Sequence, residues 1–189
     1  HLQVELDRRR PGQSHITSQR QEKDIAKILS GTFEGKTTGH PISLIIHNED
    51  QRSKDYSDIK DIFRPGHADY TYWAKYGIRD YKGGGRSSAR ETAMRVGIGS
   101  ICRKLLEDID IHVGSRVIQI HNVIDDSKID FKKGAELIRK KADESNVRCI
   151  SKTKSNQMKI CIDEAKNAGD SVGGKFEVFA TGVPMGLGS

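Results

Sequence analysis

The chain has 189 residues, of which 34% are hydrophobic and 31% charged, so residues 1–189 are expected to fold as a single globular domain. Lysine and arginine (32) exceed aspartate and glutamate (26), and the net charge of +6 favours an anionic partner, either a phosphate ligand or nucleic acid. No apolar run reaches the ~20 residues that span a bilayer, and no signal-peptide pattern opens the chain, so we expect no membrane partner.

The first elements expected along the chain are the end of a helix and two strands. Residues 1–10 are typical of the last turns of a helix, because three arginines and a Pro-Gly pair close them, and the chain is therefore expected to be a fragment. Residues 25–35 show a period of two and residues 41–48 are rich in β-branched side chains, and both patterns predict strands. Residues 49–60 carry mixed charges without periodicity, which predicts a loop with no more than a helical turn.

The second half of the chain predicts further helices and strands. Apolar residues at helical spacing predict a long amphipathic helix over residues 88–109, and residues 131–144 and 155–168 predict two more helices. Alternating patterns predict strands over residues 113–124 and 172–183. Hairpin-like strands with segregated helices favour an α+β fold over a doubly wound sheet.

Aromatic and basic side chains crowd into one segment of the chain. All five tyrosines and the single tryptophan, Trp73, lie between Tyr56 and Tyr81, among arginine, lysine and histidine residues. Such rings can stack on a flat heterocycle such as a flavin or a nucleobase, and they also pack in hydrophobic cores. The sequence leaves both interpretations open.

A glycine loop precedes the long predicted helix. Gly83, Gly84 and Gly85 permit positive φ angles and a close approach of the backbone to a ligand. Ser88 and Glu91 have the spacing of a capping box, which predicts that the helix starts at Ser88. The unpaired N–H groups and the dipole of such a helix start attract phosphate.

Two arginines at this helix start strengthen the prediction of an anionic ligand. Arg86 and Arg90 lie where the helix dipole disfavours cations by ~0.3–1 kcal/mol each. The alternative is a plain glycine linker whose arginines point to solvent or pair with local acids. The motifs G-x-x-x-x-G-K-[ST] and G-x-G-x-x-G are absent, so nucleoside triphosphate binding is not expected.

His67 follows a Pro-Gly turn signal, so its imidazole is expected on or beside a loop within reach of a ligand. Histidine side chains in general titrate near neutrality, so His67 is a candidate proton donor, whereas the plainer interpretation is a turn histidine bonded to a neighbouring carbonyl. Arg64 and the arginines at residues 8–10 could clamp carboxylate or phosphate. The alternatives for these arginines are solvation and, at residues 8–10, a favourable charge at a helix end.

A metal site is not expected. The remaining six histidines show no spacing typical of ligands. The cysteines are odd in number and far apart, which indicates neither a CxxC metal site nor a disulfide framework and favours a reducing cytoplasm. They are Cys102, Cys149 and Cys161.

Four segments together resemble the chorismate synthase family. The run FRPGHADYTYWAKYGIRDYKGGGRSSARETAMRV at residues 63–96 is similar to the central signature of that family over its whole length. The segments DRRRPGQS at residues 7–14, LSGTFEGKTTGHPI at 29–42 and GDSVGG at 169–174 match in the same order. The resemblance therefore extends over most of the chain and does not depend on one short motif.

The resemblance implies a fold and an activity. The fold would be an α+β sandwich with helices between antiparallel sheets, present here in part. The activity would be that of a carbon–oxygen lyase, which converts 5-enolpyruvylshikimate-3-phosphate to chorismate by 1,4-elimination of phosphate and a C6 hydrogen. Reduced FMN would be required without net redox, and its reduction by a separate reductase or by an internal NADPH-dependent activity stays open. Family members are usually homotetramers of the cytosol or plastid.

The resemblance also implies site residues. His67 matches the histidine of the RPGHAD motif, which is taken to protonate the reduced flavin or to hold its protonation state. The flavin-contacting positions are Arg86, Ser87 and Ser88. Arginines would face the phosphate and carboxylates of the substrate, or NADP, at Arg9, Arg64 and Arg90.

Two departures from the family pattern carry expectations of their own. Position 15 is a histidine where many members carry an arginine, so His15 is expected to bind substrate or NADP more weakly or in a pH-dependent way. The G-E-S-H-G motif, with the family's second catalytic histidine, and the late flavin-binding motifs do not occur in the sequence. The chain is thus expected to be about half of a family member, to bind FMN weakly and to make little chorismate.

Two other functions compete with this one. A non-catalytic FMN-binding module would keep the phosphate loop without the chemistry. An RNA-binding protein that uses the aromatic segment is disfavoured, because no RNA-binding motif occurs and the excess of positive charge is modest. The resemblance accordingly predicts a small-molecule substrate and no nucleic-acid partner.

Overall fold

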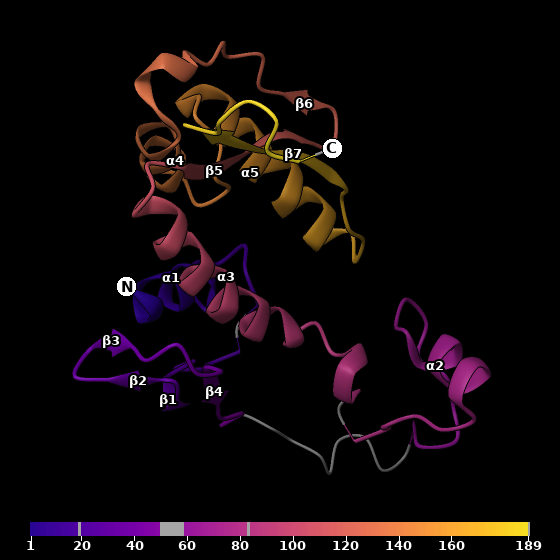
Figure 1. Ribbon diagram of the computed structural model, residues 1–189. Coiled ribbons are helices and arrows are strands. Elements are labelled where there is room, and N and C mark those ends of the chain that lie inside the picture. Colours follow the sequence, from indigo (N-terminus) through magenta and orange to yellow (C-terminus); the bar gives the residue numbers. More distant parts are fainter. Residues whose placement is uncertain (19, 50–58, 83, 189) are drawn as a thin grey trace. The chain divides into compact units, whose positions relative to one another are not determined.

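The structure is a computed structural model that describes residues 1–18, 20–49, 59–82 and 84–188 (Figure 1). It contains helices and small antiparallel sheets, which confirms the α+β class. None of the helices in these four ranges is long and apolar enough to cross a membrane.

The chain divides into two compact units. Unit 1 comprises His1–Gln13 and Ser18–Ile101, and unit 2 comprises Ser14–Thr17 and Cys102–Ser189. The single domain expected over residues 1–189 stays a prediction.

Unit 1 begins with the predicted helix. Helix α1 (Leu2–Arg9) carries two arginines in its last turn, where the helix dipole favours cations. It ends as expected before Pro11, which cannot continue the hydrogen-bonded turn. Leu6 is fully buried and anchors α1 in the unit.

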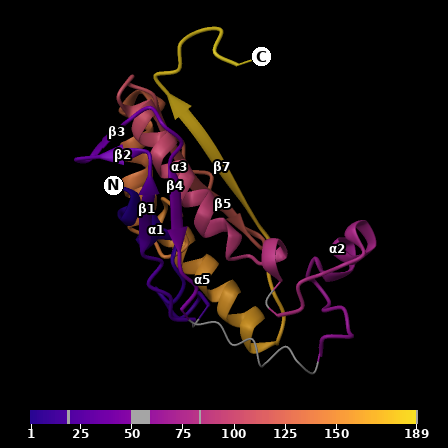
Figure 2. The same cartoon turned by 60° about the horizontal axis from the view of Figure 1, so that its bottom comes forward.

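The predicted strand at residues 25–35 is present but broken. Strand β1 (Ala26–Ser30) pairs antiparallel with β4 (Ser43–Ile46), and Figure 2 shows the two lying side by side. Strand β2 (Thr32–Phe33) instead pairs with β3 (Lys36–Thr37) in a separate hairpin. The break lies at Gly31, whose φ of +80° interrupts the extended backbone.

Helix α2 (Asp69–Tyr76) was not predicted by the periodicity of the sequence. Of its residues only Asp69 is buried, so the helix shows no apolar stripe of the usual kind. It ends at Gly77, whose φ is +71° and whose N–H donates to the carbonyl of Trp73 at 2.8 Å. The predicted loop at residues 49–60 lies mostly outside the described residues.

The long predicted helix of the central segment is confirmed with shifted ends. Helix α3 (Glu91–Glu107) follows a short 3-10 helix, η2 (Gly85–Ser87). Its small residues Ala93, Gly97 and Ser100 form the buried face. The apolar spacing therefore predicted the helix correctly, although α3 begins three residues after Ser88.

Unit 2 is built on a three-stranded antiparallel sheet in the order β6-β5-β7. The strand predicted at residues 113–124 is two strands, β5 (His112–Ile120) and β6 (Val123–Ile124), which turn at His121 with a φ of +52°. The strand predicted at the end of the chain is confirmed as β7 (Gly174–Thr181).

The helices of unit 2 pack on this sheet. Helix α4 (Ala135–Asp143) contacts β5 and β7, and α5 (Lys152–Asn167) contacts β5 and β6. The short 3-10 helix η3 (Phe131–Lys133) precedes α4, and Gly134 separates the two. Both predicted helices are therefore present, each shorter or shifted by a few residues.

A small core lies between α5 and the sheet of unit 2. Val147, Cys149 and Met158 are buried there, and partly buried apolar side chains surround them. Burial, followed by a hydrogen bond to Asp125, raises the pKa of the Cys149 thiol to about 11. Cys149 is thus a neutral core side chain at physiological pH.

Candidate functional site

The glycine loop folds against the imidazole of His67. Gly84 and Gly85 both have positive φ, at +93° and +48°, whereas Gly83 lies outside the described residues. A Cβ atom at Gly84 would lie 2.9 Å from His67 Cε1 and 3.0 Å from Ser87 Oγ. Only glycine fits this backbone conformation and this spacing, so the loop and the histidine form one site.

The capping box predicted from Ser88 and Glu91 does not form. Ser88 Oγ accepts from the N–H of Arg90 at 3.2 Å, and the N–H of Glu91 donates to the Ser88 carbonyl at 3.0 Å. The Glu91 carboxylate lies instead with the guanidinium groups of Arg86 and Arg95, at 3.3 Å and 3.4 Å. The Ser88 hydroxyl therefore lies in the turn before α3, and the prediction that α3 begins at Ser88 is wrong by three residues.

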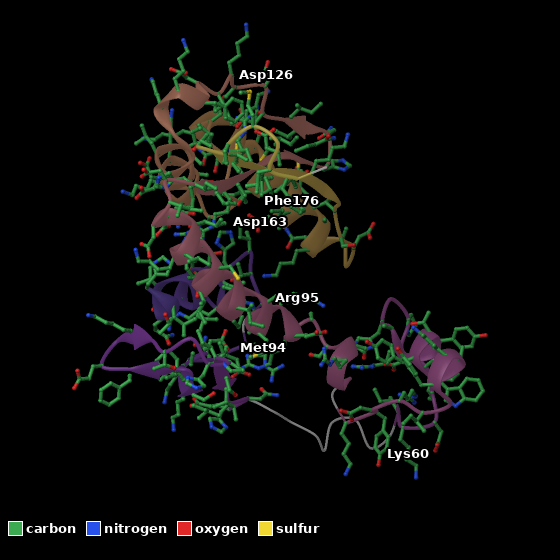
Figure 3. All side chains as sticks on the ribbon, in the orientation of Figure 1. Lys60, Met94, Arg95, Asp126, Asp163 and Phe176 are labelled. Atoms are coloured by element: carbon green, nitrogen blue, oxygen red, sulfur yellow. The ribbon has the colours of Figure 1, made fainter. Side chains whose placement is uncertain are left out.

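A cleft of about 680 Å³ opens in unit 1 at this helix start. Met94 and Arg95 of α3, both labelled in Figure 3, contribute to its wall. Two carboxylates line it, from Asp80 and Glu91. Four cationic side chains line it as well: Lys82, Arg86, Arg90 and Arg95. This excess of positive charge suits a ligand that carries phosphate or carboxylate.

His67 lies in a network around the buried carboxylate of Asp69. Its Nδ1 is 2.6 Å from Asp69 Oδ1, and Arg64 Nη2 is 3.1 Å from each ring nitrogen. Arg64 also donates from Nε to Asp69 Oδ2 at 3.1 Å, and Arg79 donates to the same oxygen at 3.2 Å. The histidine lies in a bend after Pro65-Gly66, as predicted, but its partner is a carboxylate and not a carbonyl.

Arg9 and Arg90 meet at a second buried carboxylate, Asp24. Arg9 Nη1 is 3.1 Å from Asp24 Oδ2, and Arg90 Nη1 is 2.7 Å from Asp24 Oδ1. Arg90 also lies 3.5 Å from Glu22 Oε2 and donates to the carbonyl of His47 at 2.9 Å. These two arginines therefore share one carboxylate in unit 1, whereas Arg64 pairs with a different carboxylate.

His15 belongs to unit 2 and lies against α5. Its Nε2 is 3.3 Å from Asp163 Oδ2, and its carbonyl accepts from Lys166 Nζ at 3.1 Å. The imidazole is largely exposed. These contacts explain its position without a ligand, and its role in binding stays a prediction.

Comparison with known proteins identifies the family. The family model described as "Chorismate synthase" matches residues 1–189. This chain belongs to the chorismate synthase family. The model covers every motif on which the resemblance rests, from DRRRPGQS to GDSVGG.

Relatives of this family are similar along the whole chain. The chorismate synthase of Francisella tularensis subsp. holarctica (strain LVS) is 53% identical over 191 residues, which cover 100% of this chain and 51% of the relative. That of Francisella tularensis subsp. novicida (strain U112) is 54% identical over 190 residues, or 99% of this chain and 51% of the relative. A crystal structure of chorismate synthase aligns with a TM-score of 0.75 and 36% identity, covering 100% of this chain and 51% of its own. The chain thus spans about half the length of the relatives it matches.

The aromatic side chains of this family member lie largely at the surface of α2. Tyr70, Trp73 and Tyr76 are 58%, 49% and 58% exposed. Phe63 packs against two of them, with ring centroids 5.4 Å from Tyr70 and 5.6 Å from Trp73. These three rings are thus about half exposed or more, whereas Tyr72 and Tyr81 are partly buried, and Tyr56 lies outside the described residues.

The carboxylates that organise the arginines were missed in the sequence. Asp69 follows His67 by two residues in the HAD triplet, and this spacing could have indicated a contact. Asp24 sits among mixed charges and carries no comparable signal, because Arg9 and Arg90 reach it only through the tertiary fold.

Proposed function

We propose that this chain forms part of a chorismate synthase that uses reduced FMN. The reaction is the 1,4-elimination of phosphate and a C6 hydrogen from 5-enolpyruvylshikimate-3-phosphate, which gives chorismate. The observation that carries the proposal is the cationic cleft at the start of α3, next to the glycine loop that packs on His67.

The residues of the cleft fit a flavin phosphate. A Cβ at Gly84 would clash with His67 and Ser87, so the bare backbone of the loop brings the cleft next to His67. Arg86 is 81% exposed and Arg95 73%, and both share the single charge of Glu91, which leaves positive charge for a ligand. When bound, reduced FMN would supply the reduced flavin that the reaction of this family requires. The reaction itself involves no net oxidation or reduction.

Each predicted site residue has a role in this proposal. His67 holds or moves a proton at Nε2, the ring nitrogen beside Gly84. The flavin is contacted by Arg86, Ser87 and Ser88. The phosphate and carboxylates of the substrate, or NADP, are bound by Arg9, His15, Arg64 and Arg90.

The family membership also supports a cellular setting for the proposed enzyme. We expect a cytoplasmic protein of aromatic amino-acid biosynthesis that assembles as a homotetramer. NADPH is the expected source of electrons for the flavin. Its partners are small molecules, with neither nucleic acid nor membrane among them.

Flavin fluorescence tests the proposal directly. FMN is titrated into the chain and into the variants Arg86→Ala and Lys141→Ala, with and without 5-enolpyruvylshikimate-3-phosphate. Loss of a charged hydrogen bond costs about 1.5–3 kcal/mol, so Arg86→Ala should weaken FMN binding roughly 10-fold to 100-fold. Lys141 is exposed on α4 in unit 2, and its removal controls for the change in net charge.

The same titration separates an enzyme from a simple flavin-binding module. An enzyme site should respond to substrate, so that 5-enolpyruvylshikimate-3-phosphate changes the flavin signal or affinity and His67→Ala alters that response. A module without the chemistry would bind FMN and ignore the substrate. Failure of the chain to bind either ligand, or equal effects of Arg86→Ala and Lys141→Ala, would overturn the proposed site.

A further inference from the structure

Asp69 is the most connected side chain near His67. It is only 1% exposed, and its two carboxylate oxygens contact the imidazole and the guanidinium groups of Arg64 and Arg79. The N–H of Arg64 donates to Asp69 Oδ2 as well, at 3.3 Å. A buried carboxylate in such surroundings is stabilised in its charged form.

The charge of Asp69 decides which nitrogen of His67 carries the proton. Hydrogen bonds from Arg64 hold the pKa of Asp69 well below its usual range, so the carboxylate is ionised at neutral pH and accepts only. His67 Nδ1 lies 2.6 Å from Asp69 Oδ1, which is a short hydrogen-bond distance. Nδ1 must therefore be the donor, and a neutral His67 is left with Nε2 unprotonated.

The other side of the imidazole faces the glycine loop. A Cβ at Gly84 would lie 2.9 Å from His67 Cε1 and 3.3 Å from Nε2, so these two ring atoms point toward the loop. Arg64 Nη2 lies 3.1 Å from each ring nitrogen, which places it over the face of the imidazole and not in line with the Nε2 lone pair. The ring is thus held on its Nδ1 side by a carboxylate and open on its Nε2 side toward the cleft loop.

We propose that Asp69 is a positioning residue, whose carboxylate holds His67 in the Nδ1-protonated tautomer and aims Nε2 at the glycine loop. A carboxylate that orients an imidazole in this way leaves the far nitrogen free to accept or return a proton. The catalytic importance of this role rests on the proposed function, in which His67 acts on the ligand bound beside the glycine loop. The tautomer itself follows from the contacts of Asp69 alone.

Nitrogen NMR of the ligand-free chain tests the tautomer. Long-range ¹H–¹⁵N correlations in the labelled chain distinguish a protonated ring nitrogen from an unprotonated one, and the variant His67→Gln assigns the signals of His67. We expect the wild-type signal of a protonated Nδ1. In Asp69→Asn we expect that pattern to be lost and replaced by a mixture of tautomers.

The variant Arg79→Gln separates positioning from mere structural support. Arg79 donates to the same Asp69 oxygen and to the carbonyls of Ile59, Lys60 and Ile62. Its loss should lower the stability of the segment yet leave the His67 tautomer unchanged. If Asp69→Asn does not fold, the spectra of the wild-type chain and Arg79→Gln still decide the matter.

Two outcomes would overturn the role of Asp69. One is a wild-type His67 protonated at Nε2, and the other is an unchanged tautomer in a folded Asp69→Asn. The spectra need no flavin, so they are independent of the FMN titration. A chain that shows the expected tautomer but fails to bind FMN would refute the proposed function and leave the positioning role intact.

Discussion

Two buried aspartates organise the arginines of unit 1. Asp24 and Asp69 are each 1% exposed. The guanidinium groups that contact them belong to Arg9 and Arg90 for Asp24, and to Arg64 and Arg79 for Asp69. Asp69 faces the two cations of Arg64 and Arg79, whereas at Asp24 a second carboxylate, Glu22, also lies against Arg90. In both places the carboxylates fix the arginines in position.

The stability that Asp69 contributes should depend on pH with a definite sign. Hydrogen bonds from Arg64 lower the pKa of Asp69 in the folded chain, whereas an unfolded aspartate titrates near about 4. The contribution is therefore complete above about pH 4 and is lost as the pH falls through the folded pKa. In urea unfolding, we expect the difference in stability between wild type and Asp69→Asn to stay constant from about pH 7 to 5 and to shrink below about pH 4. A difference that persists unchanged to about pH 3 would contradict this account.

Gly84 offers a test of the contact between the loop and His67. Gly84→Ala places a Cβ at a φ of +93° and 2.9 Å from His67 Cε1, whereas Gly77→Ala places one at +71° with no atom within 4 Å. Left-handed backbone costs a residue with a Cβ about 1–2 kcal/mol, so Gly77→Ala should lose about that much unfolding free energy and Gly84→Ala, which also clashes with His67, should lose more. Only Gly84→Ala should also shift the imidazole resonances of His67 and weaken FMN binding. Equal spectra in the two variants would argue against the contact.

At the level of the elements, the sequence predicted those with a periodic apolar pattern and missed the others. The spacing of apolar residues found α3 and the alternation found β7, because both elements bury one face. Helix α2 was missed because its aromatic side chains are exposed and leave no apolar stripe. The break at Gly31 was missed because the period of two was followed across the glycine, although glycine is the residue that permits a positive φ.

The features of the candidate site likewise divide into those that the sequence predicts and those that it does not. The loop position of His67 could be predicted, because turn preferences are local. The carboxylate partners of Arg9 and Arg90 could not, because Asp24 reaches them from a distant part of the chain. Local chemistry therefore indicates which residues bind, and the tertiary fold decides how they are held.

Two serines that precede helices form a pair of tests. Ser88 Oγ accepts from the N–H of Arg90 at 3.2 Å in the turn before α3, and Ser151 Oγ caps α5 by accepting from the N–H of Lys154 at 3.3 Å. Removal of a helix cap costs about 1 kcal/mol, so Ser151→Ala should lower the unfolding free energy by about that much and Ser88→Ala by no more. Only Ser88→Ala should weaken FMN binding in the fluorescence titration. Loss of FMN affinity in both variants would assign the effect to general destabilisation.

At the scale of the whole molecule, the connections of the chain favour cooperative unfolding of the two units. The chain crosses between them after Gln13, after Thr17 and again after Ile101. The last crossing lies within α3, which continues from Glu91 to Glu107 as one helix. A helix gains stability as its hydrogen-bonded turns propagate along its length, so unfolding of one end should destabilise the other end. This continuity supports the expectation of one domain.

Core substitutions in each unit test that expectation. Leu6 in unit 1 and Met158 in unit 2 are both fully buried, and truncation of such a side chain to alanine costs about 2–5 kcal/mol. Trp73, the single tryptophan, reports on unit 1 by fluorescence, and hydrogen exchange of the α5 amides reports on unit 2. If the chain is one domain, Met158→Ala should shift the urea midpoint of the Trp73 signal as far as it shifts that of α5, and Leu6→Ala should do the same in reverse. If the units are independent domains, each substitution should shift only the midpoint of its own unit, because the two units then unfold in separate transitions.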